Sequence, residues 1–216
     1  MPDYVWTDPQ GRKRPGHKPK GKGGGVLLAV ILVAAIGAGG TAGVASTAAG
    51  AGGTTAGTSS ARASSQARRQ DADRIRTRLL RQATRVNHRF DTADDCAAHS
   101  YGDVREYFRT QPCVALHRAW FEVRDRRRGL VLVAVSWVEM PDTGSAREFH
   151  ELVDTYGTGN VTELSREQGR HRRVRFTGRY YEDRRAGTTV VNAQAEPVGR
   201  AAVAAELEEL VVKALR

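Results

Sequence analysis

Residues 130–140 read LVLVAVSWVEM, an almost continuous apolar run. A short run that is apolar on both faces belongs in the middle of a sheet, because a half-exposed strand keeps one polar side. Leu116–Arg124 precedes it across the charged turn Asp125–Gly129, and Pro141 and Asp142 end it. The sequence therefore predicts a hairpin whose second strand, Leu130–Met140, is central in an antiparallel sheet.

A second hairpin is predicted further along the chain. Arg173–Tyr181 alternates between apolar side chains and arginines or threonine, as a strand with one covered face does. Arg184–Gly187 forms the turn, and Thr188–Glu196 returns until Pro197 breaks the strand.

Helices are predicted around these hairpins. A basic amphipathic helix over 67–90 carries one apolar stripe at Ile75, Leu79, Ala83, Val86 and Phe90. It either lies on a membrane or partner, or docks its stripe on the domain that follows. Three more helices are expected: Tyr101–Arg109, one from Ala146 to Tyr156 closed by Gly157, and one with the stripe Val203, Leu207, Leu210, Val211 and Ala214.

The resulting order is α-α-β-β-α-β-β-α. The economical architecture is an α+β domain, an antiparallel sheet of about four strands with helices on one face. One transmembrane helix is expected to precede it.

That helix is predicted from an uncharged run, Gly23–Ala61, which follows six cationic residues. Val26–Ser46 would span about 30 Å as a helix, which matches a hydrocarbon core. Only Val26–Ile36 is strongly apolar, so a cleaved signal peptide is the alternative. Gly39 and Gly43 form a GxxxG pair, a candidate dimer contact.

The organisation along the chain follows from this segment. We expect a disordered basic cytoplasmic stub (1–25), the span (26–46), a flexible Gly/Ala/Ser/Thr linker (47–66), the basic helix (67–90) and a domain outside the cytoplasm (91–216).

Charge distribution argues against nucleic acid as a partner, although the formal net charge is +10. Residues 1–25 carry a net charge of +4, residues 62–90 carry +7, and residues 91–216 carry −1. The excess therefore flanks the uncharged run, where basic residues are attracted to anionic lipid.

Cys96 and Cys113 are the only cysteines. An even number in an oxidising compartment predicts a disulfide. The rival is a metal site, because Cys96-x-x-His99 has ligand spacing, but a structural zinc site needs four ligands and no second pair follows. We expect neither a metal nor a cofactor.

Two further groups are candidate sites. His150-Glu151-Leu152-Val153-Asp154 resembles the zinc-protease signature HExxH, with Asp154 in place of the second histidine. Arg173, Arg175 and Arg179 would share one open sheet face and bind an anionic polymer, lipid headgroups or an acidic partner. The alternative for these arginines is a solvated face paired with carboxylates such as Glu196 or Glu122.

Two stretches, DCAAHSYGDVREYFRTQPC (95–113) and DTYGTGNVTELSRE (154–167), resemble a family of single-pass membrane or exported proteins of high-GC Gram-positive bacteria. The resemblance covers residues 91–196. It implies the same layout along the chain and no activity.

The leading hypothesis is a non-catalytic, membrane-anchored domain that binds a protein or an anionic envelope component. Its predicted contacts are membrane lipid, such a partner, and a second copy of the chain. The alternatives are an exported enzyme with a site near His150, Glu151 and Asp154, and a structural subunit of an envelope secretion or transfer machine.

Overall fold

The computed structural model describes residues 4–7, 13–16, 55–124, 129–199 and 204–215. The chain divides into two compact units, Met1–Gly52 and Gly53–Arg216. In the first, β1 (Tyr4–Thr7) and β2 (Lys13–Gly16) form an antiparallel hairpin. These two strands are the only part of the expected basic stub (1–25) that the structure describes, and the first, YVWT, contains residues that favour β structure.

The predicted membrane span 26–46, with Gly39 and Gly43, lies outside the described residues. Among the residues that the structure does describe, no helix combines the length and the apolar character that crossing a membrane requires.

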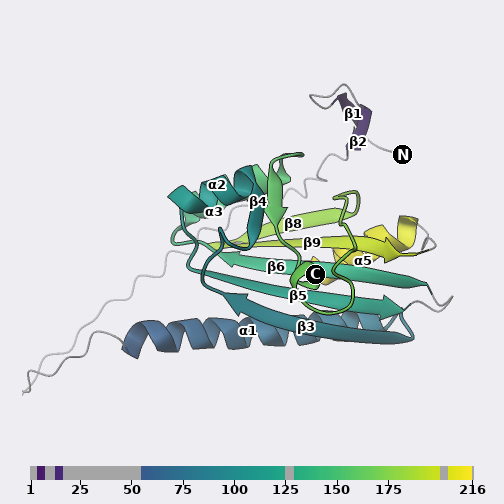
Figure 1. The fold of residues 1–216 in the computed structure, drawn as a ribbon, viewed down its shortest axis with the longest axis horizontal. Helices are drawn as coiled ribbons and strands as arrows, with labels where there is room; N and C mark the ends of the chain where they lie inside the picture. Colours follow the sequence, from purple (N-terminus) through teal and green to yellow (C-terminus); the bar gives the residue numbers. More distant parts are fainter. Residues whose placement is uncertain (1–3, 8–12, 17–54, 125–128, 200–203, 216) are drawn as a thin grey trace, which may run out of the picture. The chain divides into compact units, whose positions relative to one another are not determined.

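The second unit is built on a five-stranded antiparallel sheet in the order β3-β5-β6-β9-β8 (Figure 1). The strands are β3 (Arg85–Ala93), β5 (Ala115–Arg124), β6 (Leu130–Glu139), β8 (Tyr181–Ala186) and β9 (Thr189–Val198). The α+β class and the antiparallel sheet are confirmed, and β6 is central as predicted. The sheet has five strands where about four were expected.

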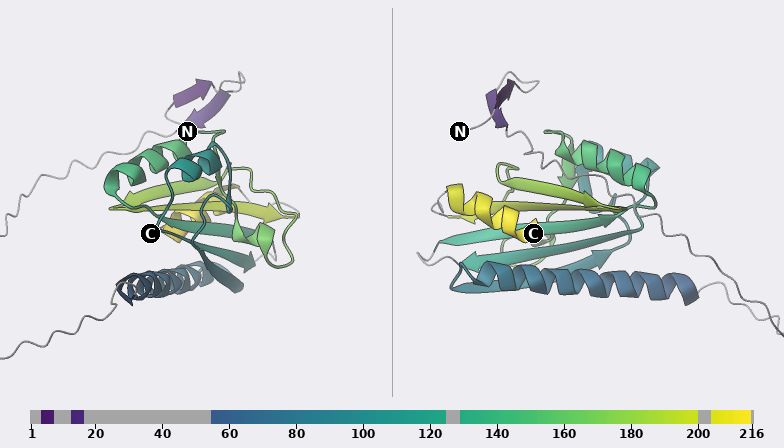
Figure 2. Two further views of the ribbon diagram at one scale, coloured as in Figure 1. Left: turned by 60° about the vertical axis from the view of Figure 1, so that its left-hand side comes forward. Right: turned by 180° about the vertical axis from the view of Figure 1, so that it is seen from behind.

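Helices α1 (Thr55–Leu80) and α5 (Ala204–Leu215) cover one face of this sheet. Seen from behind, α5 crosses in front of the strands and α1 runs along the β3 edge (Figure 2). The sheet residues of this core are Val86 of β3 and odd-numbered residues of β5, β6 and β9: Ala119, Phe121, Val123, Val131, Val133, Val135, Trp137, Val191, Ala193 and Ala195.

The opposite face is covered as well, so the expectation of helices on one face is wrong. Near one end lie α2 (Asp103–Thr110) and α3 (Thr143–Asp154), whose core includes Leu116, Val138 and Val190 of the sheet. The short elements β4 (Ser100–Gly102), β7 (Gly159–Val161) and α4 (Leu164–Glu167) continue this layer. Most residues of β5, β6 and β9 are accordingly buried at both odd and even positions.

The predicted helix over 67–90 is the largest error in the element assignment. Helix α1 begins at Thr55, inside the expected linker, and ends at Leu80, and β3 then begins at Arg85. Ile75, Leu79, Val86 and Phe90 nevertheless join the same core, so the apolar stripe is present but divided between a helix and a strand.

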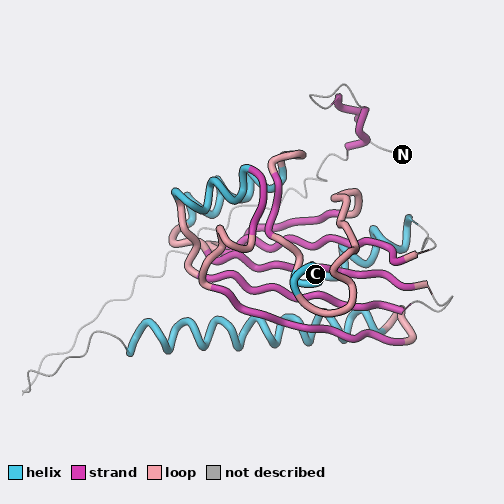
Figure 3. Tube along the Cα trace, viewed as in Figure 1, coloured by secondary structure: helices cyan, strands magenta, loops and turns pink. Residues whose placement is uncertain are grey.

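The predicted strand Arg173–Tyr181 is also absent. Residues 168–180 form a loop that crosses the front of the sheet, drawn in pink in Figure 3, and β8 begins only at Tyr181. Val174 and Phe176 pack on the sheet face beside Trp120 and Leu132. The alternating pattern therefore marks an extended segment lying on the sheet.

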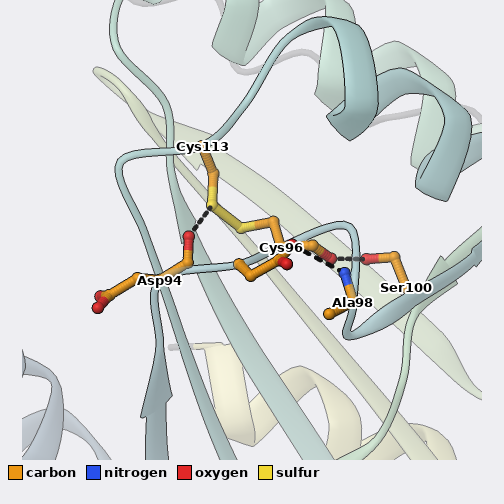
Figure 4. Close-up of a disulfide and its surroundings, with 6 residues drawn as sticks. Asp94, Cys96, Ala98, Ser100 and Cys113 are labelled. Atoms are coloured by element: carbon orange, nitrogen blue, oxygen red, sulfur yellow. Dashed lines mark hydrogen bonds between the residues drawn. A yellow bond between two sulfur atoms is a disulfide. The ribbon is translucent and has the colours of Figure 1, made fainter.

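Cys96 and Cys113 form the predicted disulfide pair, with their Cα atoms 6.1 Å apart. Figure 4 shows the pair joining the turn after β3 to the segment after α2. The backbone oxygen of Cys96 accepts a hydrogen bond from Ser100 Oγ at 2.7 Å, which orders the turn. The bridge thus ties the α2 layer to the sheet.

Candidate functional site

Polar side chains form a continuous row across the sheet, on the face opposite α1 and α5. Cross-strand pairing aligns Asp91 with Arg118, Arg118 with Ser136, Ser136 with Asn192, and Asn192 with Asp183. The row crosses all five strands, one residue from each. Paired residues share a face, so these five side chains all point into the layer above.

Three residues of this row meet a partner from the overlying layer. Glu167 of α4 accepts two hydrogen bonds from Arg118, at 2.7 and 2.8 Å. Asn160 of β7 accepts one from Asn192 Nδ2 at 3.0 Å. His150 Nε2 of α3 lies 2.8 Å from Asp183 Oδ2. Buried polar groups need such partners, so the row fixes where the upper layer sits.

The space above the row is too small for a ligand. A cavity of about 10 Å³ lies between Arg118, Ser136, Glu163 and Gln194. A volume of that size holds about one water molecule. We therefore interpret the polar row as structural.

Glu163 is a buried carboxyl beside this cavity, 5 % exposed. Burial raises its pKa, against the opposing influences of a backbone hydrogen bond and of Arg166, whose guanidinium is 3.8 Å away. Gln194 donates a hydrogen bond to it at 3.5 Å. Folding therefore favours the protonated form of this residue.

Glu163→Gln should accordingly change stability in a pH-dependent way. Because the folded pKa is raised, the contribution of Glu163 to stability is complete below the unfolded pKa and is lost as pH rises through the folded pKa. Glutamine stays neutral. The variant should therefore have the melting temperature of the wild type at about pH 4 and a higher one at about pH 8. Thermal melts followed by circular dichroism measure this, with the exposed Glu151→Gln as control. Equal effects at both pH values would contradict the prediction.

In a second buried carboxyl, Glu122, folding favours the ionised form. Burial acts to raise its pKa, but hydrogen bonds from His171 and Arg170 hold that pKa below its ordinary value. His171 Nε2 lies 2.8 Å from the carboxylate. This group attaches the start of loop 168–180 to β5.

The histidine segment, His150–Asp154, forms the end of α3, which packs against β8. His150 pairs with Asp183 of β8, and Glu151 is exposed. Burial raises the pKa of Asp183, with His150 acting in the opposite sense and Asp154 adding to the rise. His99 pairs with Glu167 at 2.9 Å. Among the described residues, no three His, Cys, Asp or Glu side chains are grouped to hold a metal ion.

Arg173, Arg175 and Arg179 are exposed on loop 168–180. They do not form a sheet face, because that segment is not a strand. The two carboxylates expected as their partners have other contacts: Glu196 accepts hydrogen bonds from Thr177, and Glu122 accepts them from Arg170. The three arginines therefore stay solvent-facing.

A different set of arginines lines a groove on the face that carries α1 and α5. The groove has a volume of about 630 Å³, within the usual range for ligand pockets. We call it the arginine groove. Its lining includes four cations: Arg74, Arg78 and Arg81 of α1, and Arg184 of β8. Its apolar part includes Ile75, Trp137, Val191 and Ala214.

The positive charge of the groove is only partly balanced. Asp71 and Asp73 also line it, but Asp71 is bonded to Arg68 and Arg74 and Asp73 to His88. Burial and the neighbouring Arg184 lower the pKa of the Arg78 guanidinium, and Asp71 acts in the opposite sense. Among the described residues, Arg184 makes no hydrogen bond or ion pair. Arg78 and Arg184 are thus like charges in one groove, and neither forms an ion pair with a carboxylate of the described residues.

Sequence reasoning missed both the polar row and the arginine groove. A signal existed for the row, because Arg118, Ser136 and Asn192 interrupt otherwise apolar strands. The groove had a weaker signal, since Arg74, Arg78 and Arg81 lie at helical spacing beside the stripe of α1.

No protein-family model matches this chain, and neither the curated proteins nor the solved structures include one with significant similarity to it.

Proposed function

We propose that this protein is a non-catalytic binding protein, anchored in the membrane by residues 26–46, whose domain lies outside the cytoplasm and holds an anionic amphiphile in the arginine groove. The ligand class is a lipid with a phosphate-type headgroup. The single observation behind the proposal is that Arg78 and Arg184, neither of them in an ion pair with a described carboxylate, line one groove together with apolar side chains.

The two halves of the groove suit the two halves of such a ligand. Guanidinium groups form strong charge-assisted hydrogen bonds with phosphate oxygens, often two at once. An anion between Arg78 and Arg184 would also remove their mutual repulsion. The floor around Trp137 and Val191 offers apolar contact for the first part of an acyl chain.

Trp137 provides a direct measurement of binding. An anionic phospholipid with brominated acyl chains should quench the fluorescence of the full-length chain in non-ionic detergent, because the bromines reach the groove floor. A zwitterionic phospholipid with the same chains should quench much less. Trp137→Phe should lose this quenching and leave only the background from Trp6 and Trp120.

Arg78→Gln with Arg184→Gln should weaken the anionic lipid by about tenfold or more, since hydrogen bonds to charged groups contribute about 1.5–3 kcal/mol each. Arg109→Gln is the matched control, because Arg109 is exposed on α2 and paired with Glu106. Equal losses in both variants, or equal binding of the zwitterionic lipid, would contradict the proposal. If inorganic phosphate displaced the anionic lipid at a similar concentration, the groove would be a simple anion site and not a lipid site.

The anchored topology has its own test. The basic residues before the uncharged run favour a cytoplasmic N-terminus, and the disulfide pair suits an oxidising compartment. Sequencing the N-terminus of the mature protein should give the start of the chain. A start near residue 44 or 52 would instead show a cleaved signal peptide.

A further inference from the structure

A second pocket lies on the opposite face of the sheet, at the β8 edge. Its volume is about 380 Å³, and it is bounded by β4, the end of α3, β7, loop 168–180, Tyr181 at the start of β8 and Gln194 in the middle of β9. Four of its lining residues are aromatic: Tyr101, Tyr156, Phe176 and Tyr181. We call it the tyrosine pocket. Tyr101 and Tyr156 are also two of the large hydrophobic side chains that the domain exposes, at 37 % and 45 %.

Some polar groups of the tyrosine pocket have hydrogen-bond partners within the domain, and others do not. Gln194 donates to Glu163, and Asn160 accepts from Asn192, so both amides serve the fold. The hydroxyl of Tyr181 is buried and has no hydrogen-bond partner among the described residues. Asp154, at the end of α3, makes no hydrogen bond or ion pair there either. One carboxylate and one buried hydroxyl are therefore left for a ligand.

The electrostatic surroundings of the pocket are negative. Lysine, arginine and histidine are absent from its described lining. Burial raises the pKa of Tyr181, and Asp183 and Asp154 raise it further. Burial and Glu163 do the same for Tyr101, with Arg166 acting in the opposite sense.

Two arginines near the tyrosine pocket, Arg166 and Arg179, make contacts outside it. Arg166 pairs with Glu163 at 3.8 Å. The Arg179 guanidinium lies over the ring of Tyr180, 5.5 Å from its centroid, and Tyr180 packs against the core under α1 and α5.

We propose that the tyrosine pocket binds an alkylammonium cation, with Asp154 as its counter-ion and the aromatic side chains as its walls. Aromatic rings attract ammonium groups through the negative charge of their faces, and several rings around one carboxylate form a site for such ligands. The neutral Tyr181 hydroxyl supplies an oxygen that accepts a hydrogen bond from a primary ammonium. This site is independent of the arginine groove, which lies on the other face of the sheet.

Calorimetry on the full-length chain in non-ionic detergent tests the proposal with three probes. Choline represents a free quaternary ammonium, Nα-acetyl-lysine methylamide represents a lysine side chain of a partner protein, and 3,3-dimethylbutan-1-ol is the neutral isostere of choline. At least one cation should bind, and the neutral isostere should bind about tenfold more weakly or not at all. Whichever cation binds better identifies the source of the ammonium group.

Variants separate the pocket from the rest of the fold. Asp154→Asn should weaken the cation by about tenfold, and Tyr101→Ala by a similar factor. Glu151→Gln removes the same charge from the same helix outside the pocket and should leave binding unchanged. Quenching by the brominated anionic lipid should be unaffected by Asp154→Asn, so the two sites fail or succeed separately.

The proposal would be overturned by no binding of either cation, by equal binding of the neutral isostere, or by the same loss for Glu151→Gln as for Asp154→Asn. Tighter binding of a neutral saccharide such as N-acetylglucosamine than of either cation would also overturn it, because aromatic walls with one carboxylate can hold a sugar too.

Discussion

Glu167→Ala is expected to lower the free energy of unfolding by about 3 kcal/mol, because it leaves the buried Arg118 guanidinium without its main counter-ion. The Arg118 side chain is 1 % exposed and forms two hydrogen bonds with Glu167. Removing one partner of a buried pair costs about 3–5 kcal/mol in general. The lower end applies here, since Asp91 remains 3.3 Å from Arg118 and the Thr162 carbonyl 3.0 Å away. Urea titration followed by circular dichroism measures the change.

Glu106→Ala is the matched control for this variant. Glu106 also pairs with an arginine, Arg109, but both side chains are more than half exposed. Surface pairs contribute about 0–1 kcal/mol, so this change should be small. A loss for Glu167→Ala no larger than for Glu106→Ala would show that the buried pair contributes little.

A double variant distinguishes a stranded charge from lost packing. Adding Arg118→Met to Glu167→Ala removes the unpaired cation and keeps an apolar side chain of similar length. The double variant should therefore be more stable than Glu167→Ala alone. If it is less stable, Arg118 contributes through its contacts with Asp91 and Thr162 and not mainly through Glu167.

At acid pH, the difference in the free energy of unfolding between Glu167→Ala and the wild type should become smaller. Burial acts to raise the pKa of Glu167, but hydrogen bonds from Arg118 and His99 hold it below its ordinary value. The stability that a lowered pKa brings is present above the unfolded pKa and is lost as pH falls through the folded pKa.

The elements that could be predicted from the sequence are those with one consistent signal. LVLVAVSWVEM has turn residues on both sides and becomes the central strand β6. Asp142 caps α3 by accepting hydrogen bonds from the backbone nitrogens of Gly144 and Ser145. Gly157, just past that helix, has a φ of 96°, a conformation in which glycine is favoured.

The boundary between α1 and β3 could not be predicted, because a spacing of four residues fits two structures. Val86 and Phe90 lie on one side of a helix at i and i+4, and equally on one side of a strand at every second residue. Pairing with Val123 and Ala119 of β5 decides in favour of the strand. The competing strand partner lies more than 25 residues away along the chain, so local periodicity carries no information about it.

The candidate sites were missed for a related reason. A polar residue inside an apolar strand becomes informative only when its cross-strand neighbours are known, and Asp91, Arg118 and Asn192 come from three separate segments. The arginine groove likewise needs Arg184 of β8 beside Arg78 of α1. Strand register creates the polar row, and the packing of α1 beside β8 creates the groove. A local sequence pattern predicts neither of them.

The disulfide gives the second large expected effect. Cys96→Ala with Cys113→Ala should lower the free energy of unfolding by about 3 kcal/mol, the chain-entropy contribution of a loop of this length. The two cysteines are 17 residues apart. Alanine is preferable to serine, because Cys96 is 3 % exposed and a buried hydroxyl would add its own penalty. Urea titration without reductant measures the loss, and reduced wild-type protein should show a similar one.

The loss of stability should appear first in the loop that the disulfide closes and only later in the rest of the domain. The loop closed by the disulfide contains β4 and α2, and Phe108 of α2 packs on Phe149 of α3 with ring centroids 4.8 Å apart. Hydrogen exchange of the reduced protein should therefore accelerate first in α2, while α1, which packs on the other face, stays protected. Tyr101 lies in the same loop, so reduction should also weaken alkylammonium binding. Uniform acceleration in α1 and α2 would mean instead that the bridge stabilises the domain only through its unfolded state.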